Sequence, residues 1–332
     1  MGTEIDKNNS QFAEIIKIIE TAKERAYKAV NAELINMYWD IGEYISNKVK
    51  NEAWGKSVVS DFADFIHYNY PDIKGFSAQN IWRMKQFYET YKDKKKLSPL
   101  VREISWTNNL SIMSGAKTDE AKEFYLILAA KNHYSKRELE RQIDSMLFER
   151  TMLSQSKNKD LITKNPSLGS FRDNYVLEFL NIPDEYHEKD LRKSILLNLK
   201  KFILEFGSSF TFVGEEYRMQ VGNSDFFIDL LFFNRDLSCL VAIELKVGKF
   251  KPEHMGQLNF YLEALDRDVK KDYENPSVGL ILCTSKDDTV VEYALSRSLS
   301  QTMVSEYTLR LPDKKLLRNK LKELTELAED ND

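Results

Sequence analysis

Charged residues interrupt two neighbouring apolar segments in the second half of the chain. The first segment, Phe226–Phe233, contains Asp229 as its one charged residue. The second, Leu240–Val247, contains Glu244 and Lys246 with one residue between them. An ionised carboxylate in an apolar strand is costly unless a cation or hydrogen-bond donors satisfy it. Two carboxylates and a lysine on adjacent core strands therefore predict a site for a divalent metal ion.

The turn between the two segments, Asn-Arg-Asp-Leu, sets how their charged residues align. If Phe233 lies opposite Ser238, Asp229 faces Ala242, and Glu244 is the diagonal neighbour of Asp229 on the same face. Diagonal neighbours lie on the order of 7–8 Å apart, so their carboxylate oxygens can converge on one ion. A slip of one residue would place the two carboxylates on opposite faces.

The chemistry of these residues suits hydrolysis of a phosphodiester. Oxygen ligands without a nearby histidine or thiolate favour Mg2+ or Mn2+ over zinc. Such an ion activates water and stabilises the charge that develops on a phosphate. Lys246 shares the face of Glu244, where it can orient or deprotonate the nucleophile or stabilise negative charge. The alternative is a simple ion pair between Glu244 and Lys246 on a half-exposed strand.

A third group of residues follows on a predicted helix that begins at Pro252. Gln257 and Tyr261 are four residues apart and share one face of this helix. Alone, this spacing is typical of a surface amide and a packed tyrosine. After the Asp and Glu-x-Lys residues, it indicates a further part of the same site.

The elements that must position these residues form an α/β pattern. The order helix, three strands, helix, strand, helix predicts a mixed sheet flanked by helices. The predicted elements are a helix at 188–206, strands at 210–221, 226–233 and 240–247, a helix at 252–271, a strand at 278–283, and helices at 290–299 and 314–328.

The first half of the chain is predicted to be mainly helical. Apolar residues recur at three and four positions, which is typical of helices. The predicted helices cover 12–50 as two helices or one broken helix, 58–68, a helix capped by Ser77, 118–130 capped by Thr118, and 135–152 with a capping box. The helix after Ser77, with outward basic residues, suggests a helix-turn-helix or winged-helix arrangement. An ordinary helical hairpin is the alternative.

Length and composition agree with a two-domain globular protein. The chain has 332 residues, of which 42% are hydrophobic and 30% charged. We expect a helical domain at 12–153, a polar linker at 154–170 and an α/β domain at 171–330. The net charge of −4 provides no overall basic surface, so nucleic-acid binding would need local patches and metal bridging.

The remaining features of the sequence indicate the compartment. The N-terminus is polar and has no apolar signal core, and no apolar segment approaches the length that spans a bilayer. Cys239 and Cys283 lie in apolar strand-like segments, where reduced, buried thiols are expected. We therefore expect a cytoplasmic protein without a membrane segment.

The motif residues resemble a known nuclease superfamily. Asp229, Glu244-Leu-Lys246 and Gln257-Leu-Asn-Phe-Tyr261 resemble PD-(D/E)xK nucleases of the RecB-like and Mrr-like variant with a Gln-x-x-x-Tyr motif. Nearly the whole chain resembles the bacterial YhcG family, which joins a DUF1016-type N-terminal domain to a nuclease domain. The N-terminal resemblance rests on Tyr38-Trp-Asp-Ile-Gly42, Trp54-Gly-Lys56, Phe76-Ser77 with Met84, Ser105-Trp106, and Arg137-Glu-Leu-Glu-Arg-Gln-Ile143.

This resemblance implies a restriction-endonuclease-like fold and roles for individual residues. Asp229 and Glu244 would bind Mg2+ or Mn2+, Lys246 would serve catalysis, and Gln257 would position the lysine or the phosphate with support from Tyr261. Relatives carry a glutamate on the helix before the strands, where this chain has Arg192. Glu188, one turn earlier, is the candidate to replace it as a metal ligand.

The resemblance implies a metal-dependent DNA endonuclease whose helical domain binds DNA or a partner. By analogy, it would belong to a restriction or anti-phage defence module with other defence proteins, and it could form a homo-oligomer. One alternative is a nucleic-acid-binding or assembly protein that retains the nuclease fold with weak or no cleavage. Another is a helical scaffold joined to an unrelated α/β domain, with the two carboxylates on opposite faces of the sheet.

Overall fold

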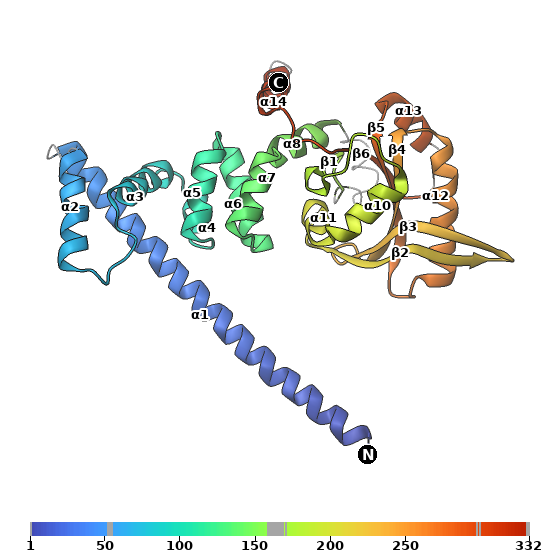
Figure 1. Cartoon of the computed structure of the whole chain (residues 1–332), viewed down its shortest axis with the longest axis horizontal. Helices are drawn as coiled ribbons and strands as arrows, with labels where there is room; N and C mark the ends of the chain where they lie inside the picture. The colour runs from blue at the N-terminus through green and yellow to red at the C-terminus, as the bar shows by residue number, and fades with distance from the viewer. Residues whose placement is uncertain are drawn as a thin grey trace. The chain divides into compact units, whose positions relative to one another are not determined.

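A computed structural model describes residues 2–51, 56–157, 169, 171–296, 298 and 300–329 of the chain. The chain divides into two compact units, unit 1 at 1–143 and unit 2 at 144–332 (Figure 1). The predicted linker at 154–170 lies largely outside the described residues. None of the described helices is both long and apolar enough to cross a membrane.

Unit 1 consists of helices in all its described secondary structure. They are α1 (Gly2–Asn51), α2 (Lys56–Asn69), α3 (Ala78–Tyr91), α4 (Leu97–Leu100), α5 (Trp106–Gly115), α6 (Asp119–Asn132) and α7 (Lys136–Asp144). The segment predicted as two helices or a broken one is the single helix α1. Helix α5 was not predicted. A wing would need strands, and the described part of unit 1 has none.

Local capping explains where several of these helices begin. The Ser77 hydroxyl accepts a hydrogen bond from the Asn80 amide, and Thr118 caps α6 in the same way. Ser135 and Glu138 form the predicted capping box, with distances of 2.9 and 3.4 Å. Residues 70–77 join α2 to α3, and this connection is longer than the turn of three to four residues in a helix-turn-helix. The arrangement therefore favours the helical-hairpin alternative.

Unit 2 contains a mixed sheet of six strands in the order β1-β6-β5-β4-β3-β2. The strands are β1 (Asn174–Val176), β2 (Phe210–Val221), β3 (Ser224–Asn234), β4 (Cys239–Lys249), β5 (Asn275–Ser285) and β6 (Thr302–Thr308). Strands β2, β3 and β4 pair antiparallel, whereas β4, β5, β6 and β1 are parallel. Strand β1 at one edge of the sheet and its neighbour β6 were not predicted.

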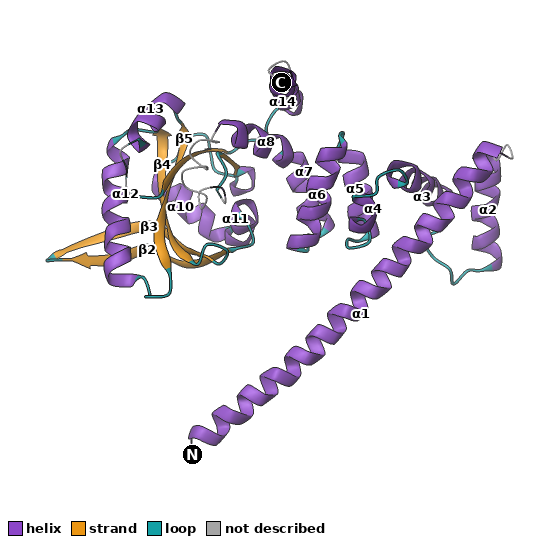
Figure 2. Ribbon diagram, turned by 180° about the vertical axis from the view of Figure 1, so that it is seen from behind, coloured by secondary structure: helices purple, strands orange, loops and turns teal. Residues whose placement is uncertain are grey.

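Helices cover both faces of this sheet (Figure 2). The helices of unit 2 are α8 (Leu147–Lys157), α10 (Glu188–Leu197), α11 (Leu199–Phe206), α12 (Glu253–Ala264), α13 (Asp288–Leu295) and α14 (Lys314–Glu329), with a 3-10 turn at Glu178–Leu180 and a π-helical turn at Leu265–Val269. Apolar residues of α10 and α11 pack with Val241, Ile243 and Leu245 on one face. Those of α12 pack with Ala242 and neighbouring strands on the other. Unit 2 is therefore a mixed sheet flanked by helices, as predicted.

Two predicted helices are each divided in the structure. The segment 135–152 forms α7 and α8, because Met146 between them adopts a left-handed conformation with φ 56°. The segment 188–206 forms α10 and α11, which meet at Asn198 with φ −117° and ψ 27°. Neither methionine nor asparagine by itself predicts a helix break at these positions.

The register of β3 and β4 differs from the predicted one by two residues. Phe233 lies opposite Leu240, and Leu231 lies opposite Ala242. Asn234 extends the ladder by pairing with Cys239, and its side chain accepts a hydrogen bond of 3.0 Å from the Leu237 amide inside the turn. Because side chains alternate with a period of two, this shift leaves the predicted residues on the same face.

Candidate active site

Two carboxylates meet across β3 and β4, as the alternation of side chains predicts. The Asp229 amide donates a hydrogen bond of 3.4 Å to Glu244 Oε1, and the Leu245 amide donates one of 3.0 Å to Asp229 Oδ2. Each acidic side chain therefore accepts from the backbone of the other strand. Continuing the ladder places Asp229 directly beside Glu244 rather than diagonal to it. The reading with the two carboxylates on opposite faces is wrong.

Glu244 is the most buried carboxylate of this group, with 2% of its surface exposed. Burial and the nearby negative charge of Asp229 raise the pKa of Glu244 to about 7, although Lys246 acts in the opposite direction. Two acids this close in an apolar layer need a cation to remain ionised together. The site therefore requires a nearby positive charge if both carboxylates are to be ionised.

Lys246 supplies part of that charge from the same strand as Glu244. Its Nζ lies 3.3 Å from Glu244 Oε2 and 3.7 Å from Glu188 Oε2. Burial lowers the pKa of Lys246, but the carboxylates of Glu244, Glu188 and Asp229 outweigh it, so this pKa is raised overall. Lys246 is held as a cation between the end of β4 and the first turn of α10.

Glu188 reaches the same end of β4 from α10. Besides its ion pair with Lys246, its Oε1 accepts a hydrogen bond of 3.4 Å from the Val247 amide. The side chain remains 45% exposed. Its carboxylate therefore lies at the open side of the site, next to the lysine.

Arg192 contacts the site directly from α10. Its Nη1 donates to Asp229 Oδ1 at 2.8 Å, and its Nη2 donates to Glu216 Oε1 at 2.6 Å. The guanidinium is largely buried, with 14% of the side chain exposed. Arg192 therefore neutralises Asp229, and helix α10 brings a cation to the position where the family resemblance led us to expect a glutamate.

Glu216 was missed in the sequence analysis. It lies in β2, where it adopts φ 41°, and its neighbours Glu215 and Tyr217 pair with Leu230 and Ile228 on either side of Asp229. A positive φ is uncommon for a residue with a side chain and marks a local irregularity of the strand. The sequence signal for Glu216 was the pair of adjacent glutamates Glu215 and Glu216, which breaks the polar-apolar alternation of β2.

Gln257 and Tyr261 share one face of α12, as predicted. Gln257 Nε2 donates a hydrogen bond of 2.7 Å to the Tyr261 hydroxyl, and Tyr261 is 5% exposed. Burial and the charges of Glu244 and Asp229 raise the pKa of Tyr261. His254, one turn earlier, was not predicted; burial and then the positive charge of Lys246 lower its pKa. Helix α12 thus contributes polar groups to the surroundings of the carboxylates.

The donor set has the chemistry that a hard divalent cation prefers, because Asp229, Glu244 and Glu188 offer only oxygens. Within the described residues, no three His, Cys, Asp or Glu side chains are grouped closely enough to hold a metal. The Asp229 carboxylate accepts hydrogen bonds from Arg192 and a backbone amide. The Glu244 carboxylate accepts them from Lys246 and a backbone amide. Asp229 and Glu244 fit a divalent ion if Arg192 withdraws from Asp229.

Comparisons with known proteins match both halves of the chain. The family model of the YhcG PDDEXK nuclease domain matches residues 169–322, and that of the DUF1016 N-terminal domain matches residues 14–150. The chain is 31% identical over 346 residues to the protein named "Putative nuclease YhcG" of Escherichia coli (strain K12), covering 92% of each chain.

Two solved structures resemble parts of the chain. One is the crystal structure of a repair endonuclease from Pyrococcus abyssi, with 18% identity and a TM-score of 0.27 over 39% of this chain and 50% of that one. The other is the structure of EndoMS in apo form, with 20% identity and a TM-score of 0.26 over 40% of this chain and 49% of that one. The chain thus spans about half the length of each.

Proposed function

Because this chain belongs to the YhcG family of PDDEXK nucleases, we propose that it is a metal-dependent DNA endonuclease that hydrolyses phosphodiester bonds. The observation that carries the proposal is that the carboxylates of Asp229 and Glu244 each accept a hydrogen bond from a backbone amide of the other's strand, with Lys246 paired to Glu244. This arrangement places two carboxylates and one ammonium group beside one another at one point of the sheet.

In this proposal Asp229 and Glu244 hold Mg2+ or Mn2+, and Glu188 is a further candidate ligand. When bound, the ion supplies positive charge that activates water and stabilises a phosphodiester under attack. A backbone amide of the opposite strand holds one oxygen of each carboxylate, so both carboxylates have a fixed orientation. Glu188 at the open side can coordinate the ion once its weak pairing with Lys246 is released.

Lys246 stabilises the negative charge that develops on the phosphate. Its ammonium group is already held by Glu244 and Glu188, so it does not have to be ordered when the substrate arrives. Gln257, oriented by Tyr261, positions the lysine or a phosphate oxygen. We further propose that unit 1 binds DNA or a protein partner, and that the protein acts in a restriction or anti-phage defence module in the bacterial cytoplasm.

A plasmid assay tests the proposed activity. Supercoiled DNA incubated with the protein and Mn2+ should be converted to relaxed and linear forms, and EDTA should stop the conversion. Lys246→Ala should slow cleavage by roughly 100-fold or more, in the range expected for a side chain that stabilises the transition state. The matched control is Lys249→Ala, three residues along the same strand, whose exposed side chain lies 3.9 Å from Asp287. Equal cleavage by Lys246→Ala and wild type would refute the assignment.

The ion pair between Arg192 and Asp229 supports a second candidate function. In this alternative the protein binds nucleic acid or acts in assembly, and it cleaves poorly. A cation that remains on Asp229 would keep a divalent ion away from one of its two main ligands. In that case the wild-type protein retards labelled DNA in a gel but leaves plasmid intact at every Mn2+ concentration. Replacing Arg192 by glutamate, the residue type that the family resemblance implies at this position, would then produce cleavage.

A further inference from the structure

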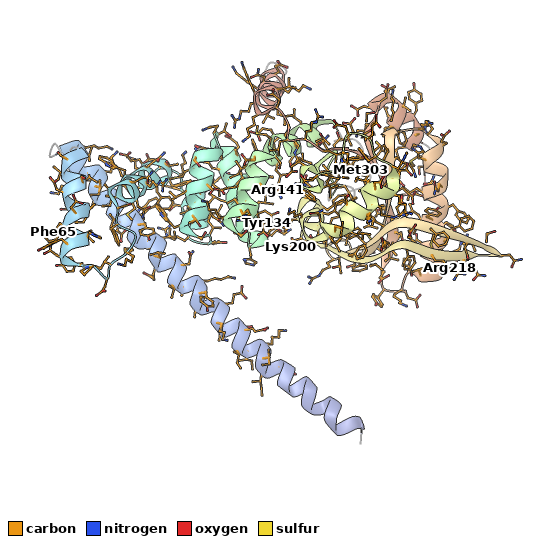
Figure 3. All side chains as sticks on the ribbon, in the orientation of Figure 1. Phe65, Tyr134, Arg141, Lys200, Arg218 and Met303 are labelled. Atoms are coloured by element: carbon orange, nitrogen blue, oxygen red, sulfur yellow. The ribbon has the colours of Figure 1, made fainter. Side chains whose placement is uncertain are left out.

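Residues 14–30 of α1 have no packing partner among the described residues of unit 1. Each residue from 14 to 30 is exposed, whereas burial of the same helix begins at Ile35. Figures 1 and 2 show this part of α1 extending past the group of helices α2–α6, and Figure 3 shows side chains standing out from it on both sides. Most helix stability in proteins comes from packing of an apolar face, so a helix of this kind requires a partner.

One face of this segment is continuously apolar. Ile15, Ile19, Ala22 and Ala26 recur at intervals of three and four residues, which places them on one stripe of the helix. Ile15 and Ile19 are 53% and 43% exposed. The opposite face is polar, and there Lys28 pairs with Glu24 at 2.8 Å. An uncovered stripe of this length is typical of an interaction surface.

We propose that this stripe binds the same stripe of a second copy of the chain, with the two helices antiparallel. The first argument is side-chain size. The N-terminal part of the stripe carries isoleucine, and the C-terminal part carries alanine. An antiparallel pair centred between Glu20 and Thr21 sets Ile15 against Ala26 and Ile19 against Ala22. Each layer then joins a large and a small side chain, which allows close packing.

Charge complementarity is the second argument. By the helical repeat, Glu14 and Arg25 lie toward one edge of the stripe, and Glu20 and Lys23 lie toward the other. Antiparallel pairing brings Glu14 near Arg25 of the second copy, and Glu20 near its Lys23. A parallel pair in register would place like charges beside each other on both edges, which disfavours that orientation.

The oligomeric state of the full chain tests the pairing. Light scattering should give twice the mass of the 38.8 kDa chain for the wild type. Ala22→Glu, in the central layer, should give the monomer mass. Thr21→Glu adds the same charge one position away, off the stripe, and should remain dimeric. A monomeric wild type, or a dimeric Ala22→Glu, would overturn the proposal. If unit 2 of the same chain covers the stripe, the wild type will be monomeric.

Cross-linking tests the orientation. Ile15→Cys and Ala26→Cys are prepared separately, oxidised alone and as a mixture, and compared on a non-reducing gel. The native Cys239 and Cys283 are buried and do not compete. Antiparallel helices predict an efficient disulfide only in the mixture. Disulfides that form as well in each variant alone indicate parallel helices and contradict the proposed pairing.

Discussion

At the scale of single residues, Arg192 decides how the site is charged. Its guanidinium joins Asp229 of β3 and Glu216 of β2, so one side chain of α10 neutralises two acids of the sheet. A divalent ion that binds Asp229 must displace this cation or coexist with it. If the proposed metal site is right, we therefore expect Arg192 to compete with the ion for Asp229 and to lower the affinity of the site.

Arg192→Gln is expected to bind Mn2+ more tightly than the wild type. The change removes the positive charge beside Asp229 and keeps a side chain of similar length. We expect about a tenfold lower dissociation constant in isothermal titration calorimetry, which corresponds to about 1.4 kcal/mol. Arg218→Gln is the control, because Arg218 pairs with Asp225 on the exposed β2–β3 hairpin (Figure 3). Unchanged or weaker binding by Arg192→Gln would show that Arg192 does not compete with the ion.

The two cysteines are expected to be inert in the folded protein. Burial raises the pKa of both Cys239 and Cys283 to about 11. At pH 8 roughly one thiol in a thousand is then ionised, and the thiolate is the reactive form. Ellman's reagent should therefore detect no thiol until urea unfolds the chain, when two per chain should react. The exposed thiol of Ile15→Cys provides a positive control, and rapid reaction of the wild type would contradict the buried placement.

At the scale of elements, the crossing of α1 and α3 depends on one glycine. A Cβ on Gly42 would lie 2.7 Å from the carbonyl carbon of Met84 and would also meet its carbonyl oxygen. Because both atoms belong to the backbone of α3, they cannot move aside without displacing the helix. Gly42 thus allows the two helices to approach closely.

Gly42→Ala should destabilise unit 1 by about 1–3 kcal/mol, the usual cost of overpacking. The four tryptophans of the chain, residues 39, 54, 82 and 106, all lie in unit 1, so tryptophan fluorescence in urea reports its unfolding alone. Gly256→Ala in α12 of unit 2, where a Cβ meets nothing within 4 Å, is the control for the readout. It should leave the fluorescence midpoint unchanged. A midpoint unaffected by Gly42→Ala would mean that the helices can separate without cost.

At the scale of the whole molecule, the boundary between the two units falls at residue 143, earlier than the predicted linker. Helix α8 belongs to unit 2, where Arg150 donates to the fully buried carboxylate of Glu205 at 3.1 Å. Glu205 also accepts a hydrogen bond of 2.9 Å from the Val176 amide. A buried ion pair of this kind ties α8 to α11 and β1, so the last turns of the predicted helical domain fold with the sheet.

Mn2+ is expected to stabilise unit 2 and leave unit 1 unaffected. A ligand that binds only the folded state adds about 2.7 kcal/mol when its free concentration is a hundred times its dissociation constant. For a unit of this size the calorimetric transition should rise by roughly 5–10 °C. The transition detected by tryptophan fluorescence should stay where it is. If both transitions rise together, the two units unfold as one.

Much of the fold and of the candidate site could be predicted because it depends on local pattern. Apolar periodicity distinguished the helical half from the α/β half, and a charge in an apolar strand identified Asp229 and Glu244 as partners. The strand period of two kept them on one face even though the register was wrong by two residues. Similarly, the spacing of Gln257 and Tyr261 predicted that they share one face of a helix, where the structure shows their side chains hydrogen-bonded.

Contacts between distant segments could not be predicted in this way. Arg192 stood out in the sequence as a missing glutamate, and only the packing of α10 against β2 and β3 showed that its guanidinium joins Glu216 to Asp229. The conformations of Met146 and Asn198, which divide two helices, likewise depend on what each half packs against. Sequence alone therefore determined which residues face the same way, because alternation is a local property of the backbone. The tertiary structure decided which charges neutralise which, because that depends on how distant elements pack.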